Sequence, residues 1–118
     1  MRPRRRHSSR TARPGRWRFA AILVLGIVAT LASGAVGQRA VARYADIDGC
    51  ATGCEVAAAG WPLPYVVDYP GLSPANEASL VGLAMRVDRL RPEAFAVDLL
   101  AWTALAALVV LLLGRRRR

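Results

Sequence analysis

Two long apolar segments, one near each end of the chain, dominate the pattern of hydrophobic and polar positions. Residues 19–36 contain no charged side chain, and residues 96–113 contain one, Asp98. A membrane-spanning helix needs roughly 17–25 mostly apolar residues, so each segment is long enough to cross a bilayer. The pattern therefore predicts two transmembrane helices, joined by a segment of mixed character over residues 37–95.

The connecting segment begins and ends with predicted helix. Residues 38–45 are expected to carry the first helix a turn or two beyond the bilayer, until Asp and Gly residues break it. Further along, Ser73 is suited to cap a helix whose first position is Pro74. Apolar residues then recur at helical spacing, which predicts an amphipathic helix through Leu80, Leu83, Ala84, Val87 and Leu90.

Aromatic residues and prolines occupy the middle of this segment. Trp61, Tyr65 and Tyr69 are four residues apart, but Pro62 and Pro64 exclude a helix here. The stretch from Tyr65 to Tyr69 instead predicts a short strand. The predicted fold class is therefore an all-α membrane protein, a hairpin of two transmembrane helices with a small extracytoplasmic segment that holds a short strand and an amphipathic helix.

The charge distribution predicts the orientation of this hairpin. All seventeen basic residues are arginine; eight lie in residues 1–18 and four more at 115–118, whereas all eight acidic residues lie between Asp46 and Asp98. Arginine-rich flanks stay in the cytoplasm, where they face anionic lipid headgroups. We therefore expect both termini, the disordered head 1–18 and the tail 114–118, to be cytoplasmic. The arginine-only, alanine-rich composition indicates a bacterial plasma membrane, and nothing points to nucleic-acid binding.

A secretory signal is the alternative interpretation of the first apolar segment. A basic head, an apolar core and small residues ending at Ala35-Val36-Gly37 also describe a cleavable signal peptide. Such a signal has an apolar core of about 7–15 residues, and this one is longer. An uncleaved anchor is the preferred interpretation, and the mass of the purified protein decides between the two.

The two cysteines of the chain, Cys50 and Cys54, lie in the predicted extracytoplasmic segment. In an oxidising compartment such a pair is expected to form a disulfide. The loop that it closes is so short that the chain-entropy model gives only about 2 kcal/mol of stabilisation. A thioredoxin-like motif is absent from the sequence, and the one histidine, His7, lies in the head, so a zinc site lacks ligands. We expect no metal and no cofactor.

Two groups of residues are candidates for protein contacts. Gly26, Thr30 and Gly34 recur every four residues on one face of the first span, and small residues let helices approach closely in lipid. The contact is either within the hairpin or between chains. Trp61, Tyr65 and Tyr69 form the second group, which either settles at the membrane surface or binds a partner.

Asp98, the one acidic residue in the apolar segments, also has two interpretations. It lies near the start of the second span, where a carboxylate at a helix N-terminus meets the positive end of the helix dipole. The alternative is an intramembrane carboxylate for ion or proton movement. The first interpretation is preferred, because the sequence offers no second buried charge to pair with it.

Part of the chain resembles a known group. Cys54, the aromatic and proline-rich stretch 60–64, and the spacing of Phe95, Asp98 and Trp102 at the start of the last span are similar to small bacterial two-span membrane proteins of uncharacterised function. The resemblance covers about residues 50–105. It implies the two-span layout and brings no activity, substrate or site.

No motif in the sequence indicates catalysis, and the segment between the spans is short for an enzyme pocket. We therefore expect a non-enzymatic accessory or interaction subunit of a membrane complex, with a membrane-protein partner or a second copy of itself. The alternative is an extracytoplasmic thiol or metal-dependent factor that uses Cys50 and Cys54.

Overall fold

A computed structural model describes residues 14–72 and 76–117 of the chain. It contains three helices and a four-stranded antiparallel sheet. The expectation of an all-α fold is therefore wrong, and the fold is mixed α/β. The reason is that four stretches of the connecting segment pair with one another as strands, and this pairing joins residues that are far apart in the sequence.

The sheet is a meander whose strands lie in chain order. β1 (Gly37–Ala42) pairs with β2 (Cys54–Ala59), β2 pairs with β3 (Val66–Asp68), and β3 pairs with β4 (Asp88–Leu90), each time antiparallel. The register places Ala40 opposite Val56 and Asp68 opposite Asp88. β1 and β4 are the outer strands, so each has one edge that is not paired within the sheet.

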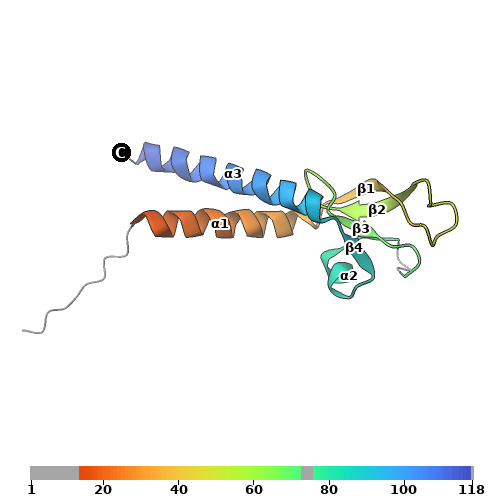
Figure 1. Cartoon of the computed structure of the whole chain (residues 1–118). Helices are drawn as coiled ribbons and strands as arrows, with labels where there is room; N and C mark the ends of the chain where they lie inside the picture. The colour runs from red at the N-terminus through yellow and green to blue at the C-terminus, as the bar shows by residue number, and fades with distance from the viewer. Residues whose placement is uncertain (1–13, 73–75, 118) are drawn as a thin grey trace, which may run out of the picture.

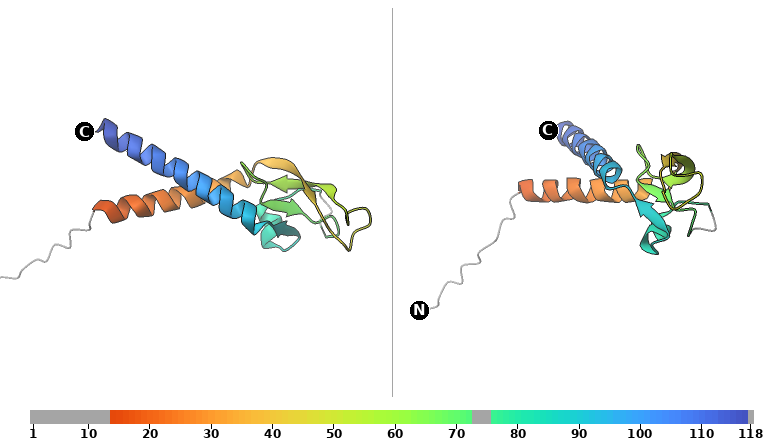
Figure 2. Two further views of the ribbon diagram at one scale, coloured as in Figure 1. Left: turned by 45° about the horizontal axis from the view of Figure 1, so that its top comes forward. Right: turned by 45° about the vertical axis from the view of Figure 1, so that its right-hand side comes forward.

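Two long helices extend from one end of this sheet. α1 (Pro14–Ser33) leads almost directly into β1, and α3 (Pro92–Arg116) begins immediately after β4. Figure 1 shows the two helices side by side, with the start of α1 and the end of α3 far from the sheet. Figure 2 shows the same arrangement from two other directions, in which the helices cross at an angle.

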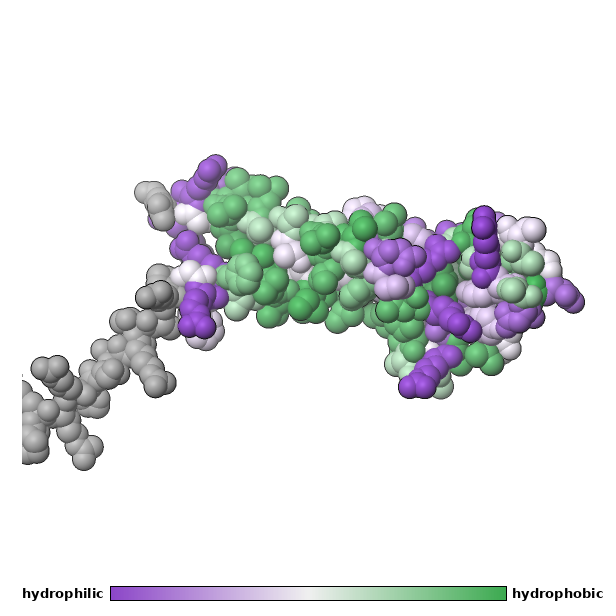
Figure 3. Space-filling model, in the orientation of Figure 1, coloured by the Kyte–Doolittle hydropathy of each residue, from purple (hydrophilic) through white to green (hydrophobic). Residues whose placement is uncertain are grey.

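Both helices are long and apolar enough to cross a membrane. Few of their residues are buried inside the molecule, and large side chains such as Val24 (58 % exposed) and Leu100 (71 % exposed) point outward. Figure 3 shows the resulting apolar surface along the helices, with polar residues at their far end and on the sheet. Since a soluble protein rarely exposes so large an apolar surface, this surface is suited to lipid.

Two helical expectations for the connecting segment are wrong. Residues 38–42, expected to continue the first helix, belong to β1. The predicted amphipathic helix is reduced to α2 (Leu80–Ala84), which Ser79 caps by accepting the N–H of Gly82, and Leu90 lies in β4. The proposed cap at Ser73 and Pro74 lies outside the described residues.

The sheet has a small hydrophobic core on each face, because neighbouring residues of a strand point to opposite sides. One core is formed by residues from the first three strands, Ala42, Val56, Ala58 and Val67. The other is formed by Ala59, Tyr65 and Val66, and Leu80, Leu83 and Phe95 from the helices pack against it. The expected short strand at Tyr65–Tyr69 is confirmed at its centre, Val66–Asp68.

The loop between β1 and β2 carries the disulfide that the sequence predicts. Cys50 and Cys54 are bonded to each other, and their Cα atoms are 4.8 Å apart. Cys50 is buried, and its carbonyl accepts the backbone N–H groups of Tyr44 and Gly53. The bond therefore closes a turn that backbone hydrogen bonds already define, at the end of the sheet farther from the long helices (Figure 1).

Candidate functional site

The aromatic and proline-rich stretch forms a loop, residues 60–64, that lies between the sheet and the two long helices. We call it the junction loop. The N–H of Trp61 donates to the hydroxyl of Ser33 in α1 over 3.4 Å. From α3, the Nε1–H of Trp102 donates to the carbonyl of Trp61 over 2.9 Å, and the two indole rings lie 5.7 Å apart. The loop is thus bound to both helices.

Asp98 supplies the other link from α3 to the junction loop. Its Oδ1 accepts the backbone N–H of Leu63 over 3.0 Å, and the residue is fully buried. The expectation that Asp98 lies at the N-terminus of its helix is wrong, because α3 begins at Pro92 and Arg91 occupies the cap position. The helix starts more than a turn earlier than the apolar pattern indicates, which leaves Asp98 inside it and turned toward the loop.

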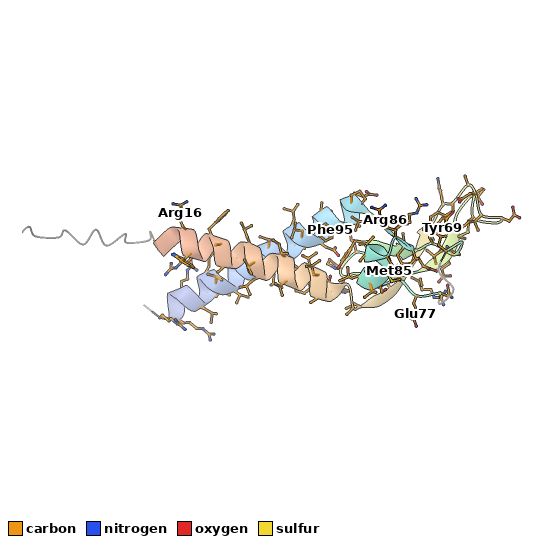
Figure 4. The ribbon with its side chains drawn as sticks, turned by 90° about the horizontal axis from the view of Figure 1, so that it is seen from below. Arg16, Tyr69, Glu77, Met85, Arg86 and Phe95 are labelled. Atoms are coloured by element: carbon orange, nitrogen blue, oxygen red, sulfur yellow. A yellow bond between two sulfur atoms is a disulfide. The ribbon has the colours of Figure 1, made fainter. Side chains whose placement is uncertain are left out.

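Tyr65, which follows the junction loop, connects the sheet to α1. Its side chain is fully buried, and its hydroxyl donates to the carbonyl of Thr30 over 2.7 Å. Burial raises the pKa of the Tyr65 phenol, which keeps the proton in place for this hydrogen bond. Phe95 of α3 packs edge-on against the ring at 5.3 Å between centroids. Figure 4 shows Phe95 where α3 approaches the sheet.

The small residues of the first span lie at contacts within the chain. A Cβ atom on Gly26 would come within 2.9 Å of the Cα of Thr103 in α3. A Cβ atom on Gly34 would meet the Tyr65 hydroxyl at 2.6 Å. Thr30 is fully buried, and its own hydroxyl donates to the carbonyl of Gly26. These positions therefore let α1 approach both α3 and the sheet closely.

Tyr69 lies away from the junction loop and directly follows the last residue of β3. Its hydroxyl donates to the carboxylate of Asp46, and this hydrogen bond lowers the pKa of Asp46. The ring of Tyr44 packs edge-on against it at 4.9 Å, and the guanidinium of Arg89 lies 4.7 Å from its centroid. The three sequence-predicted aromatic residues are thus divided between two sites. Trp61 and Tyr65 are at the junction, and Tyr69 joins a cationic and aromatic cluster.

A pair of buried carboxylates faces across the last two strands. Asp68 is fully buried with no hydrogen-bond partner for either carboxylate oxygen, and Asp88 is directly opposite it at 5 % exposure. One oxygen of Asp88 accepts the N–H of Ser79 over 2.9 Å. Burial, reinforced by the nearby charge of Asp68, raises the pKa of Asp88.

The described residues contain no group of three or more histidine, cysteine or acidic side chains able to hold a metal ion.

The sequence analysis missed the acidic pair and a group of arginines, Arg43, Arg89 and Arg91, that meet at one cleft. Neither has a local signal, because the acidic pair forms only when β3 pairs with β4, and the arginines come from the ends of β1 and β4, which are distant in the sequence. Comparison with protein-family models, with curated proteins and with solved structures finds no match.

Proposed function

We propose that the chain is a membrane-anchored interaction protein, a non-enzymatic accessory subunit of a larger complex in a bacterial plasma membrane. The observation that carries this proposal is the junction loop. Trp61 and Leu63 are hydrogen-bonded to α1 and α3, and the adjoining Tyr65 binds α1. A small sheet held in this way on two spans presents its surface at a fixed height above the bilayer.

The orientation follows from the arginines at the far ends of the helices. Arg16 and Arg18 lie in the first turns of α1, and Arg115 and Arg116 close α3. Figure 4 shows Arg16 at the end remote from the sheet. Because such flanks are retained on the cytoplasmic side, the sheet domain lies outside the cytoplasm, and the helix ends contact anionic headgroups. In this orientation the disulfide is in the oxidising compartment where it is stable.

The alternative, a thiol or metal-dependent factor that uses Cys50 and Cys54, has less support. The two sulfurs are bonded to each other, and Cys50 is only 6 % exposed. A reactive thiol needs an accessible and electropositive surrounding. A structural disulfide fits these observations better than an exchangeable one.

Photo-crosslinking in living cells tests the proposal. A photoreactive amino acid is placed at Trp61 or at Met85, which are 51 % and 70 % exposed. Leu100, on the apolar outer surface of α3, is the control position. We expect an adduct of one defined mass with another protein from at least one external position. Adducts with lipid alone would contradict an interaction protein, and adducts only with a second copy would contradict an accessory subunit.

A further inference from the structure

The sheet domain has an open cleft of about 510 Å³ on the face opposite α2. Residues at the end of β1 and in β4 line it, chiefly Val41, Arg43, Tyr44, Arg89, Leu90 and Arg91. We call this the basic cleft. β1 and β4 are not neighbours in the sheet, yet the guanidinium of Arg91 donates to the carbonyl of Val41. The sheet is therefore curled, and the cleft lies between its two outer strands.

The arginines of the basic cleft are not neutralised by ion pairs. In the part of the chain that the structure describes, the one ion pair joins Arg39 to Glu55, outside the cleft. Arg89 instead stacks on Tyr69, whose hydroxyl binds the nearby carboxylate of Asp46, and Arg91 binds a backbone carbonyl. The three arginines of the cleft thus outnumber this one carboxylate. The buried carboxylates of Asp68 and Asp88 belong to the other face, where Asp88 meets the start of α2. The cleft is thus positively charged although the connecting segment as a whole carries more acidic than basic residues.

We propose that the basic cleft binds an extended acidic segment of the partner protein. A guanidinium pairs with a carboxylate through two parallel hydrogen bonds, which favours acidic side chains in a site with three arginines. Apart from the carbonyl of Val41, which Arg91 already binds, the unpaired edges of β1 and β4 offer backbone groups to an extended peptide. Val41 and Leu90 leave 64 % and 43 % of their surface exposed, so apolar side chains beside the acidic ones also find contacts.

The position of the cleft favours a protein over a lipid headgroup. β1 starts at Gly37, next to the end of α1, and Arg43 follows its last residue. At about 3.3 Å per residue, the strand places Arg43 roughly 20 Å beyond Gly37. In the proposed orientation the outer end of the cleft, at Arg43, therefore stands above the headgroups, whereas Leu90 is level with Gly37 in the sheet register and lies nearer to them. This inference rests on the proposed function, since it gives the chemistry of the partner.

A binding experiment with peptides tests the inference. The full chain is placed in nanodiscs of neutral phosphatidylcholine, and dye-labelled hexaglutamate is titrated by fluorescence anisotropy. Hexaglutamine and hexalysine carry the same dye. We expect saturable binding of hexaglutamate alone, with an affinity that falls as salt rises. Absence of hexaglutamate binding, or equal binding of hexaglutamine, overturns the inference.

Matched arginine variants locate the site. The double variant Arg43→Gln/Arg89→Gln is expected to weaken hexaglutamate binding at least about tenfold. The control Arg39→Gln/Arg86→Gln removes the same charge outside the cleft and is expected to change binding less than about twofold. Equal losses in both variants indicate non-specific attraction and overturn the site. The melting temperature of each variant shows that it remains folded.

A competitor separates a peptide site from a simple anion site. Inorganic phosphate is added to the bound hexaglutamate and compared with chloride at the same ionic strength. We expect both salts to displace the peptide equally. Selective displacement by phosphate assigns the cleft to a small anion and overturns the peptide. If the chain does not bind hexaglutamate but still forms one defined crosslink from Trp61, the acidic partner is excluded and the proposed accessory role stands.

Discussion

Asp98 is fully buried in α3, and one of its carboxylate oxygens accepts the backbone N–H of Leu63. Replacing it by alanine leaves that donor without a partner. The loss of such a hydrogen bond costs about 1–3 kcal/mol, so we predict that Asp98→Ala lowers the free energy of unfolding by this amount. Thermal unfolding in nanodiscs, followed by circular dichroism, measures it.

Asp98→Asn is the matched control for this prediction. Its amide oxygen still accepts the N–H of Leu63, and it buries no charge. We therefore expect a melting temperature at or above that of the unmodified chain. Equal losses in the alanine and asparagine variants would show that the charge, and not the hydrogen bond to the junction loop, is what the fold requires.

Asp88 makes the stability of the folded chain depend on pH. Burial and the facing Asp68 raise the pKa of Asp88 in the folded chain, so the folded state binds this proton more tightly than the unfolded state. The stabilisation is fully present below the ordinary carboxyl pKa of about 4 and is lost as the pH rises through the raised folded value. We predict that Asp88→Asn raises the melting temperature at neutral pH, with a smaller gain near pH 4.

The reason for this gain is local. Asparagine keeps an oxygen for the N–H of Ser79, which Asp88 now binds, and its amide can donate to Asp68, whose oxygens have no partner. Asp48→Asn, at an exposed position, is the control and is expected to change little. Unfolding curves at the two pH values measure both variants. A gain for Asp88→Asn that is independent of pH would contradict titration of this carboxyl.

The contact between the two long helices depends on the absence of a side chain at Gly26. A Cβ atom there would come within 2.9 Å of the backbone of Thr103. Overpacking of this kind costs about 1–3 kcal/mol, so we predict that Gly26→Ala destabilises the helix pair by that amount. Gly114→Ala is the matched control, because no atom other than those of the neighbouring residues and the adjacent helix backbone lies within 4 Å of the added Cβ.

Thermal unfolding in nanodiscs compares these two glycine variants. A loss of stability confined to Gly26→Ala supports a contact within the chain. If Gly26→Ala leaves the melting temperature unchanged but abolishes the association of two copies, Gly26 serves contact between chains instead.

The long helices could be located from the sequence because their signal is local and continuous. The sheet could not. β1 and β2 have the sequences GQRAVA and CEVAAA, and alanine and glycine are poor strand formers. These segments become strands because they pair with each other and bury Ala42, Val56 and Ala58. Such pairing depends on residues that are distant in the sequence, which a local pattern does not record.

The end of α2 shows a second limit of the sequence. The apolar spacing continues to Leu90, but the helix ends when Arg86 adopts a positive φ of 62°. The N–H of Arg86 then binds the carbonyl of Leu83, and the N–H of Val87 binds that of Gly82. This pair of bonds forms a Schellman motif, which usually has glycine at the position of Arg86. With arginine there, the sequence has no stop signal.

The candidate site was predictable only in part for the same reason. The residues 60–65 stand out by composition, and their prolines correctly exclude a helix. Their partners Ser33, Asp98 and Trp102 lie on two helices about 70 residues apart in the sequence. The arginines of the basic cleft also come from two distant parts of the sequence, Arg43 from one and Arg89 and Arg91 from the other. Only the curling of the sheet brings Arg43, which follows β1, near Arg89 in β4.

The even number of strands decides that α1 and α3 lie at the same end of the sheet. Each antiparallel pairing reverses the chain, so after four strands it returns to the end of the sheet from which it started. α1 enters β1 at that end, and α3 leaves β4 there. The far ends of both helices therefore lie on the same side (Figure 1). The strand count alone gives this result, whereas the proposed side of the membrane rests on the arginine flanks.

Cysteines introduced one at a time at Gly15, Asp48 and Arg117 test the strand count and the arginine flanks separately. The native disulfide does not react with maleimide, so only the introduced cysteine is labelled. In intact cells, a membrane-impermeant maleimide is expected to label Asp48→Cys at once, and Gly15→Cys and Arg117→Cys only after permeabilisation. Labelling of both helix ends but not of Asp48→Cys would show that the hairpin is inserted in the opposite orientation. Labelling of Arg117→Cys without Gly15→Cys would contradict the hairpin itself, because the four-stranded sheet places these two residues on the same side.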